Sequence, residues 1–476
     1  MKELFRRKSI DQLIDHNAPN RLRPTLSAWH LVLLGVGAIV GTGIYVLVGV
    51  GAERAGPAII ISFAIAGVIC ACAALAYAEL ATMMPASGSA YTYSYASMGE
   101  LVAWVVGWAL ILEYSVVCSA VAVGWAGYAV SSLQDIGIDL PRLIIAGPKD
   151  GGLVNFPAIF VIAVITSLLL IGVRESATVN SWLVLIKITA LVVFVVVAFR
   201  HFSASNFSPF MPEGFLPHNV RIDDETVRYG VMPAAAITFF AFYGFDAVST
   251  AAEETKDPGR NLAIGVMGSM IICTIIYMAV CAAAIGALPI VEFAKAADPL
   301  AFILRSIGYP AIATGLSLAV VLGIPTVILA FMYGQSRIFF VMARDGLLPR
   351  QLGTVHAKTG APVAMTIITG VVCALMAGIL PLSEIVELAN AGTLAAFVAT
   401  AAALMILRIR EPNRARPFKA PLAFVVGTAA IIGCIFLFYN LPYATQIRFF
   451  IWMAIGLVVY FVFSRGASVL SKQKGA

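Results

Sequence analysis

The stretch Gly35-Val-Gly-Ala-Ile-Val-Gly-Thr-Gly-Ile44 lies in the middle of the first long apolar run of the chain. It holds four glycines at a depth where a membrane-spanning helix is otherwise most regular. Glycine weakens a helix interior and lets the backbone come close to other atoms. Gly37 and Gly41 also have the small-xxx-small spacing of closely packed membrane helices, so helix packing is the alternative interpretation.

A second stretch of this kind, Phe239-Phe-Ala-Phe-Tyr-Gly-Phe-Asp246, follows in the second half of the chain. Broken helices at membrane depth occur only where they face protein or a water-filled cavity. Two broken helices in corresponding positions of two halves point to a binding site at the membrane midplane. The pair of stretches therefore favours a binding site over helix packing alone.

The composition indicates the class of protein. Of the 476 residues, 61% are hydrophobic and only 12% are charged, whereas soluble proteins average about 25% charged residues. Apolar runs of roughly twenty residues, the length that crosses a bilayer, recur along the chain. We therefore predict an all-α polytopic membrane protein, with no cleaved signal peptide because a polar segment precedes the first run. The seven cysteines lie inside apolar runs without the spacing of a metal site or a disulfide framework.

The apolar runs predict twelve membrane spans. They lie near 28–49, 57–83, 98–130, 153–172, 180–199, 230–252, 262–288, 311–340, 363–380, 384–407, 421–439 and 446–464. Most of the 31 lysines and arginines fall on the side of the N-terminus, which places both termini in the cytoplasm. The two breaks lie in spans 1 and 6. Because five is odd, a second unit of five spans enters the membrane from the opposite side, which is an inverted repeat.

This topology divides the chain into five segments. They are a cytoplasmic N-terminal arm (1–27), a first inverted repeat (28–199), an extracellular loop (200–229), a second inverted repeat (230–407), and spans 11 and 12 with a cytoplasmic tail (408–476).

Three further motifs accompany the two glycine-containing stretches. They are Pro85-Ala-Ser-Gly-Ser-Ala-Tyr-Thr-Tyr93, Glu253-Glu-Thr-Lys-Asp-Pro-Gly-Arg-Asn261 and Met342-Ala-Arg-Asp-Gly-Leu-Leu-Pro349. In this order they resemble the amino acid–polyamine–organocation superfamily and, within it, the cationic amino acid transporter family, from about residue 20 to the end of span 12. The resemblance implies the leucine-transporter fold, a 5+5 inverted repeat plus two extra helices, and a bacterial proton-coupled amino acid permease of the inner (plasma) membrane.

An amino acid carries a carboxylate and an ammonium group on one carbon, and broken helices suit both. The N-terminal end of a half-helix offers free N–H groups, and the C-terminal end offers free carbonyl groups. The resemblance implies that Thr42 and Gly43 hold the carboxylate, and that Gly41 permits its close approach. It also implies that the ammonium group is bound by the backbone carbonyls of Ile39, Phe240, Ala241 and Tyr243.

Lys187 is a lone cation inside span 5, about 10 Å of helix rise from the start of that span. A lysine at the centre of a spanning helix costs roughly 2.5–3.5 kcal/mol on insertion scales, and desolvation disfavours its charged form. The alternative is that its side chain reaches toward the cytoplasmic headgroups. In the family that the chain resembles, a lysine here contacts a carbonyl of the unwound part of span 1, and its protonation governs the hinge. The resemblance thus implies the proton as coupling ion, with no cofactor.

Three more side chains belong to the predicted site. Glu113 lies in the middle of span 3, and Asp246 lies just past the second break. Buried carboxyl groups at such positions bind the substrate side chain, take part in gating, or brace the broken backbone through hydrogen bonds. The alternative is a protonated carboxyl group with a purely structural role. The resemblance places Phe331 where cationic relatives carry a small pocket residue. A phenyl ring there shortens the site, so we expect small neutral amino acids to be preferred slightly, with cationic ones still accepted.

The sequence therefore predicts a secondary transporter that imports amino acids by proton symport, with an obligate amino acid exchanger of the same fold as the alternative. A channel needs a repeated selectivity ring, and an enzyme needs a nucleophile–base or metal constellation; the sequence suggests neither. The expected partners are the amino acid and the lipid bilayer, without nucleic acid. A small single-span accessory subunit and the oligomeric state stay open.

Overall fold

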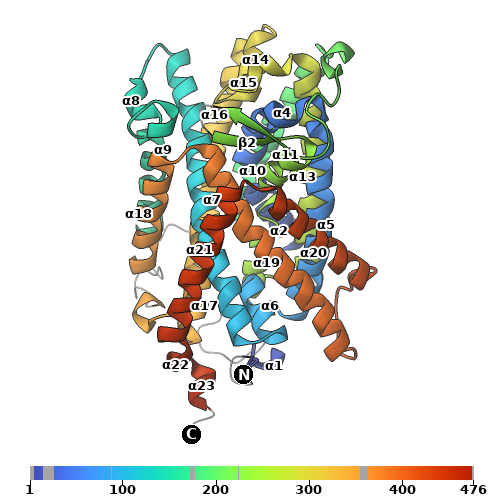
Figure 1. The fold of residues 1–476 in the computed structure, drawn as a ribbon, viewed down its shortest axis with the longest axis vertical. Coiled ribbons are helices and arrows are strands. Elements are labelled where there is room, and N and C mark those ends of the chain that lie inside the picture. The colour runs from blue at the N-terminus through green and yellow to red at the C-terminus, as the bar shows by residue number, and fades with distance from the viewer. Residues whose placement is uncertain are drawn as a thin grey trace.

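The computed structural model describes residues 5–13, 26–86, 88–171, 177–222, 225–353 and 363–473, most of which are helical. Within these ranges, nine helices are long and apolar enough to cross a membrane, and three shorter apolar helices accompany them. Most of them run along the long axis of the molecule (Figure 1). The chain is therefore a membrane-spanning helical protein, as its composition predicts. Of the predicted arm at 1–27, residues 1–4 and 14–25 lie outside the described residues.

The first half of the chain contributes the helices that surround the first break. They are α1 (Ile10–Leu13), α2 (Ala28–Ile39), α3 (Thr42–Tyr45), α4 (Leu47–Ala55), α5 (Ile59–Met83), α6 (Ser89–Ser97), α7 (Glu100–Asp135), α8 (Arg142–Ile145), α9 (Phe156–Ile171) and α10 (Ala177–Phe199).

The second half begins with two short strands, β1 (His218–Ile222) and β2 (Glu225–Tyr229). Its helices are α11 (Val231–Thr238), α12 (Ala247–Thr250), α13 (Pro258–Ala287), α14 (Ile290–Phe293), α15 (Pro299–Ser306), α16 (Pro310–Gly323), α17 (Pro325–Arg344), α18 (Val363–Ile379), α19 (Leu382–Arg410), α20 (Ala423–Asn440), α21 (Tyr443–Val459), α22 (Arg465–Ala467) and α23 (Val469–Gln473).

The glycine-rich stretch contains both a helix break and closely packed glycines, each in a different part of it. Helix α2 ends at Ile39, Gly41 has an extended backbone, and α3 begins at Thr42. Gly35 and Gly37 lie inside α2 instead, where an added Cβ atom would overlap side chains of neighbouring helices; at Gly37 it would lie 2.7 Å from Val184. The first two glycines therefore serve close packing, and the break begins beyond them.

The second break lies where the sequence predicts it. Helix α11 ends at Thr238, a 3₁₀ turn covers Phe239–Phe242, and α12 begins at Ala247. Between them Gly244 has a φ angle of +111°, a conformation that glycine adopts without strain. The two interrupted helices thus leave backbone groups unpaired at two places inside the helical bundle.

The run predicted as one span at 311–340 is one candidate span, Pro310–Arg344, in which α16 passes into α17 at Pro325, a residue without a backbone N–H group. The structure differs from the predicted architecture in one detail. The prediction of an all-α chain missed β1 and β2, which pair antiparallel within the loop at 200–229. Arg228 of this hairpin donates hydrogen bonds to the carbonyls of Tyr439 (2.6 Å), in the last turn of α20, and Leu441 (3.1 Å), just after it. The hairpin lies at the opposite end of the molecule from α1 and α23 (Figure 1).

A buried carboxylate joins α5 to the segment that links α19 and α20. The side chain of Glu79 is 1% exposed and accepts two hydrogen bonds from Arg408, at 2.8 and 2.6 Å. Arg416 lies 3.0 Å from the same carboxylate, and the backbone N–H of Ala420 donates to it at 2.8 Å. The carboxylate of Glu79 thus compensates the charges of both Arg408 and Arg416. Its removal would leave two guanidinium charges that the protein interior solvates poorly.

We expect Glu79→Gln to destabilise the protein by about 3 kcal/mol, because breaking a buried ion pair from one side strands its partner. The measurement is the apparent melting temperature of the purified protein in detergent. Glu411→Gln is the matched control, since Glu411 forms a more exposed pair with Arg414 and should contribute less than about 1 kcal/mol. Equal melting temperatures for the two variants would contradict this account of the Glu79 cluster.

Candidate functional site

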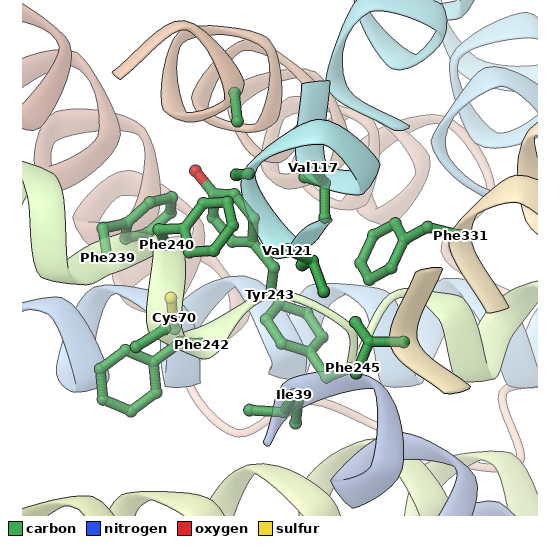
Figure 2. Packing of buried hydrophobic residues seen from close by; sticks show 14 of the residues in the cluster. Ile39, Cys70, Val117, Val121, Phe239, Phe240, Phe242, Tyr243, Phe245 and Phe331 are labelled. Atoms are coloured by element: carbon green, nitrogen blue, oxygen red, sulfur yellow. The ribbon is translucent and has the colours of Figure 1, made fainter. Parts of the chain in front are cut away.

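A small cavity lies where the two helix breaks meet. Its volume is about 10 Å³, room for roughly one water molecule, so an amino acid enters only if the surrounding helices move apart. Figure 2 shows aromatic side chains of the second break together with residues of α2, α7 and α17. The residues that line the cavity are Ala38, Ile39, Gly41, Thr42, Gly43, Val117, Val121, Phe240, Tyr243, Val327 and Phe331.

The start of α3 offers backbone N–H groups to this cavity. Thr42 and Gly43 are the first two residues of the helix, and N–H groups in the first turn have no acceptor within it. The hydroxyl of Thr42 donates to the carbonyl of Val121 on α7 at 3.2 Å, which ties α3 to α7. An added Cβ atom at Gly43 would overlap the backbone of Ala241, so the two breaks touch at this glycine.

The carbonyl groups of the breaks are partly occupied by other donors. The carbonyl of Ile39 accepts a hydrogen bond from the hydroxyl of Tyr277 at 2.9 Å, and that of Phe240 accepts one from the N–H of Tyr243 at 3.3 Å. Each carbonyl oxygen has a second lone pair that can still accept a bond. The predicted ammonium ligands Ile39, Phe240 and Tyr243 therefore line one cavity, while Ala241 lies at its edge against Gly43.

Asn390 of α19 holds the second break in shape, and sequence reasoning missed it. Its side-chain nitrogen donates to the carbonyl of Ala236 at 2.7 Å, and its side-chain oxygen accepts a hydrogen bond from the hydroxyl of Tyr243. The side chain of Asn390 is fully buried. A lone amide in the middle of an apolar span was the available signal, because such a group needs polar partners inside the bundle.

Lys187 of α10 reaches the first break and is fully buried. Its ammonium group donates to the carbonyls of Gly37 (2.8 Å) and Val40 (3.1 Å) and lies 3.4 Å from the hydroxyl of Thr326. An added Cβ atom at Gly323 would lie 2.8 Å from Cδ of this lysine, so the glycine makes room for its aliphatic part. The side chain thus points into the protein and not toward the headgroups, and it links the first break to α17.

The two predicted carboxyl groups lie beside the cavity and do not line it. Asp246 accepts hydrogen bonds from the hydroxyl of Tyr114 (3.1 Å) and from the N–H of Gly244 (3.2 Å), so it braces the second break. Glu113 is also buried, and neither of its carboxyl oxygens has a hydrogen-bond partner among the residues that the structure describes. Among the roles predicted for these groups, this geometry favours bracing for Asp246.

Phe331 lies in the wall of the cavity with 1% of its surface exposed. Its ring centroid is 5.2 Å from that of Tyr114, in an edge-to-face arrangement. Val117 and Val121 of α7 and Val327 of α17 complete this apolar wall. The sequence did not single out these valines, because a valine in an apolar span looks the same whether it faces lipid or substrate.

Two ion pairs lie toward opposite ends of the bundle. Near the hairpin, Arg54 at the end of α4 contacts Glu387 of α19 at 3.2 Å, and both side chains are less than 10% exposed. Toward the end with the termini, Arg337 of α17 binds Glu254, and its guanidinium group lies 4.1 Å from the ring centroid of Tyr333. The side chains of this second pair are 13% and 25% exposed. Neither pair lines the cavity, and each joins segments that are far apart in the sequence.

The described residues hold no group of three or more His, Cys, Asp or Glu side chains that could bind a metal ion. The chemistry of the cavity is instead that of helix ends. It combines N–H donors, carbonyl acceptors and an apolar wall, which suits a small zwitterion with an apolar side chain.

A family model described as amino acid permease matches residues 26–463. The chain belongs to this family. It is 44% identical to the branched-chain amino acid permease BcaP of Bacillus subtilis over 474 residues, which cover 98% of this chain and 99% of the relative. It is 40% identical to the methylthioribose transporter of the same organism over 99% of this chain and 100% of the relative.

Among plant proteins, the cationic amino acid transporter 4, vacuolar, of Arabidopsis thaliana is 36% identical over 87% of this chain and 68% of the relative. These relatives are transporters and not enzymes, which confirms the family resemblance of the sequence motifs and the prediction that this permease is not an enzyme.

Two glycine variants separate binding from packing in this permease. In Gly41→Ala the new Cβ atom lies 3.4 Å from Val327, an ordinary contact, and a φ angle of −144° is open to any residue. We expect an unchanged melting temperature and at least tenfold weaker binding of radiolabelled amino acid, because the methyl group narrows the cavity. In Gly43→Val the overlap with Ala241 should lower both stability and binding. Full binding by Gly41→Ala would place the substrate elsewhere.

Proposed function

We propose that this permease imports neutral amino acids together with protons by alternating access across the plasma membrane of a bacterium. Its two breaks belong to spans 1 and 6 of a twelve-span leucine-transporter fold with a 5+5 inverted repeat. Spans 1–5 at 28–199 and spans 6–10 at 230–407 form the two repeats. The observation that carries the proposal is the meeting of the two breaks at one cavity, with Lys187 bound to carbonyls of the first break.

The arrangement of the termini supports this topology. Helices α1 and α23 lie at the same end of the molecule (Figure 1), as an even number of crossings requires. Among the described residues, nine longer helices and the three shorter apolar helices α2, α9 and α18 agree in number with the twelve proposed spans. Helix α2 continues through the first break into α3 and α4, so it forms a single span with them.

Proton coupling follows from the position of Lys187. While protonated, its ammonium group satisfies carbonyls that the broken helix leaves without N–H partners, and this stabilises the closed first break. Loss of the proton weakens both bonds, since charge-assisted hydrogen bonds are roughly twice as strong as neutral ones. The first break then becomes free to move, so proton release and helix movement belong to one step.

The substrate we propose is a small or medium-sized neutral amino acid. The N–H groups of Thr42 and Gly43 take its carboxylate, and the free lone pairs of the break carbonyls take its ammonium group. Val117, Val121 and Phe331 then face an aliphatic side chain. The branched-chain amino acid permease of Bacillus subtilis, to which the chain is 44% identical, supports an aliphatic substrate by its name.

Lys187→Met tests the coupling. We expect this variant to insert and fold, because methionine is apolar and of similar length, but with a lowered melting temperature, because the carbonyls of Gly37 and Val40 lose this donor. It should lose accumulation of labelled alanine driven by a pH gradient in proteoliposomes. Exchange of labelled for unlabelled alanine without a gradient should persist, since it needs no net proton movement. Lys295→Met is the control, because Lys295 lies in an exposed position near Glu53.

Two results would contradict the proposed coupling. One is gradient-driven accumulation by Lys187→Met at the level of the wild type and with the same pH dependence. The other is a wild type that takes up alanine only when amino acid is present inside the vesicles, which would identify an obligate exchanger.

Phe331→Ser tests the specificity. In the wild type we expect alanine and branched-chain amino acids to compete with labelled alanine more strongly than arginine does. Removal of the ring should strengthen competition by arginine at least tenfold, because changes in an apolar pocket shift selectivity by about 1–3 kcal/mol. Phe340→Ser on the same helix is the control, since that ring is 38% exposed.

Strong competition by arginine in the wild type would overturn the proposed specificity. Methylthioribose belongs in the same assay, because one relative carries its name. It lacks a carboxylate, so we expect it to compete poorly.

A further inference from the structure

A second cavity, of about 320 Å³, lies at the end of the molecule where α1, α22 and α23 lie. Residues from the N-terminal arm, the start of α7 and the end of the chain meet there. They are Arg6, Glu100, Phe461, Val462, Arg465, Gly466 and Ser471. This volume is at the lower end of the range for small-molecule sites, and the transport cavity described above shares none of these residues.

The charged part of this terminal cavity is net positive. Arg6 and Arg465 contribute two guanidinium groups, whereas Glu100 contributes one carboxylate. That carboxylate accepts hydrogen bonds from the hydroxyls of Tyr95 (3.1 Å), Tyr460 (3.1 Å) and Ser468 (2.6 Å). Hydroxyl donors thus help to stabilise its charge, and the two guanidinium groups in the cavity wall can donate hydrogen bonds to an anion.

The arm is held at the cavity by its backbone. The N–H of Glu100 donates to the carbonyl of Arg6 at 2.8 Å, which places this arginine at the start of α7. On the other side, a π-helical turn at Tyr460–Ser464 links α21 to α22 and so to Arg465. The two arginines come from opposite ends of the chain, and both are brought to one place by ordered backbone.

The other wall of the cavity is apolar and faces outward. Val462 is 82% exposed and Phe461 is 51% exposed, at the lower end of a helix whose outward side chains Ile451, Ile455 and Val458 are also exposed. Helix α21 is fixed against α7 by paired indoles. Trp108 and Trp452 stack at 4.7 Å, and each donates to the other's carbonyl, at 2.9 and 3.0 Å. The apolar strip above the cavity is therefore a firm surface that faces lipid in a membrane.

We propose that this cavity binds the phosphate group of an anionic phospholipid, whose acyl chains lie along the outward side of α21. A phosphodiester is an anion, and arginine forms paired hydrogen bonds to phosphate. The cytoplasmic leaflet supplies anionic lipid, and clustered basic residues at its surface bind it. The adjoining apolar strip selects a lipid over a soluble phosphate.

The experiment compares lipid retention by native mass spectrometry of the purified full-length protein in mixtures of phosphatidylglycerol and phosphatidylcholine. The wild type should retain one phosphatidylglycerol with at least tenfold preference. Arg6→Gln/Arg465→Gln should reduce that preference at least tenfold, because each arginine near an anionic surface contributes about a fivefold effect. Arg7→Gln, next to Arg6 but outside the cavity wall, should keep the preference of the wild type.

A second pair of variants leaves both arginines in place. An added Cβ atom meets nothing within 4 Å at Gly466, in the cavity wall, or at Gly315, on α16. Gly466→Leu should fill the cavity and reduce phosphatidylglycerol retention as the double variant does, with an unchanged melting temperature. Gly315→Leu should change neither quantity.

Three outcomes would overturn the proposal. They are undiminished preference in both Arg6→Gln/Arg465→Gln and Gly466→Leu, equal retention of the two lipids by the wild type, and displacement of the bound lipid by millimolar glycerol phosphate. The last result would identify a site for soluble phosphate.

Discussion

The structure depends on the hydrogen bonds that Lys187 donates to the carbonyls of Gly37 and Val40. A helix that stops inside a membrane leaves carbonyl groups that neither lipid nor the next turn can satisfy, and each costs several kcal/mol. A single ammonium group from α10 meets two of them. The same hydrogen bonds lower the free-energy cost of burying the lysine. The helix break and the buried ammonium group therefore stabilise each other. Removal of either leaves the other unsatisfied.

The sequence was sufficient to predict the positions of both breaks, because glycine at membrane depth has few purposes other than close packing or interruption. It also identified Lys187, Thr42, Gly43 and Phe331, which the structure brings to one cavity or to the break beside it. The family resemblance added the expected roles of these residues. Their roles stay predictions until the variants described above are measured.

Other parts of the site were beyond the reach of the sequence. Val117, Val121 and Val327 face the cavity, but their orientation depends on how α7 and α17 pack, which periodicity in an apolar helix does not reveal. Gly323 and Thr326 contact Lys187, although each is more than a hundred residues away from it in the sequence. The hairpin of β1 and β2 was missed for a related reason. Its strands are only five residues long, and Arg228 bonds to the end of α20, a contact between segments far apart in the sequence.

The two ion pairs at opposite ends of the bundle are not equivalent. Arg54 and Glu387 are nearly sealed from solvent, whereas Arg337 and Glu254 are partly hydrated. Separating a sealed pair exposes two charges to an environment that must first admit water, but a hydrated pair exchanges one set of partners for another at little cost. In the alternating-access cycle proposed above, the hydrated pair would separate more readily than the sealed one. The opening that parts Arg54 from Glu387 would then be the slower of the two openings.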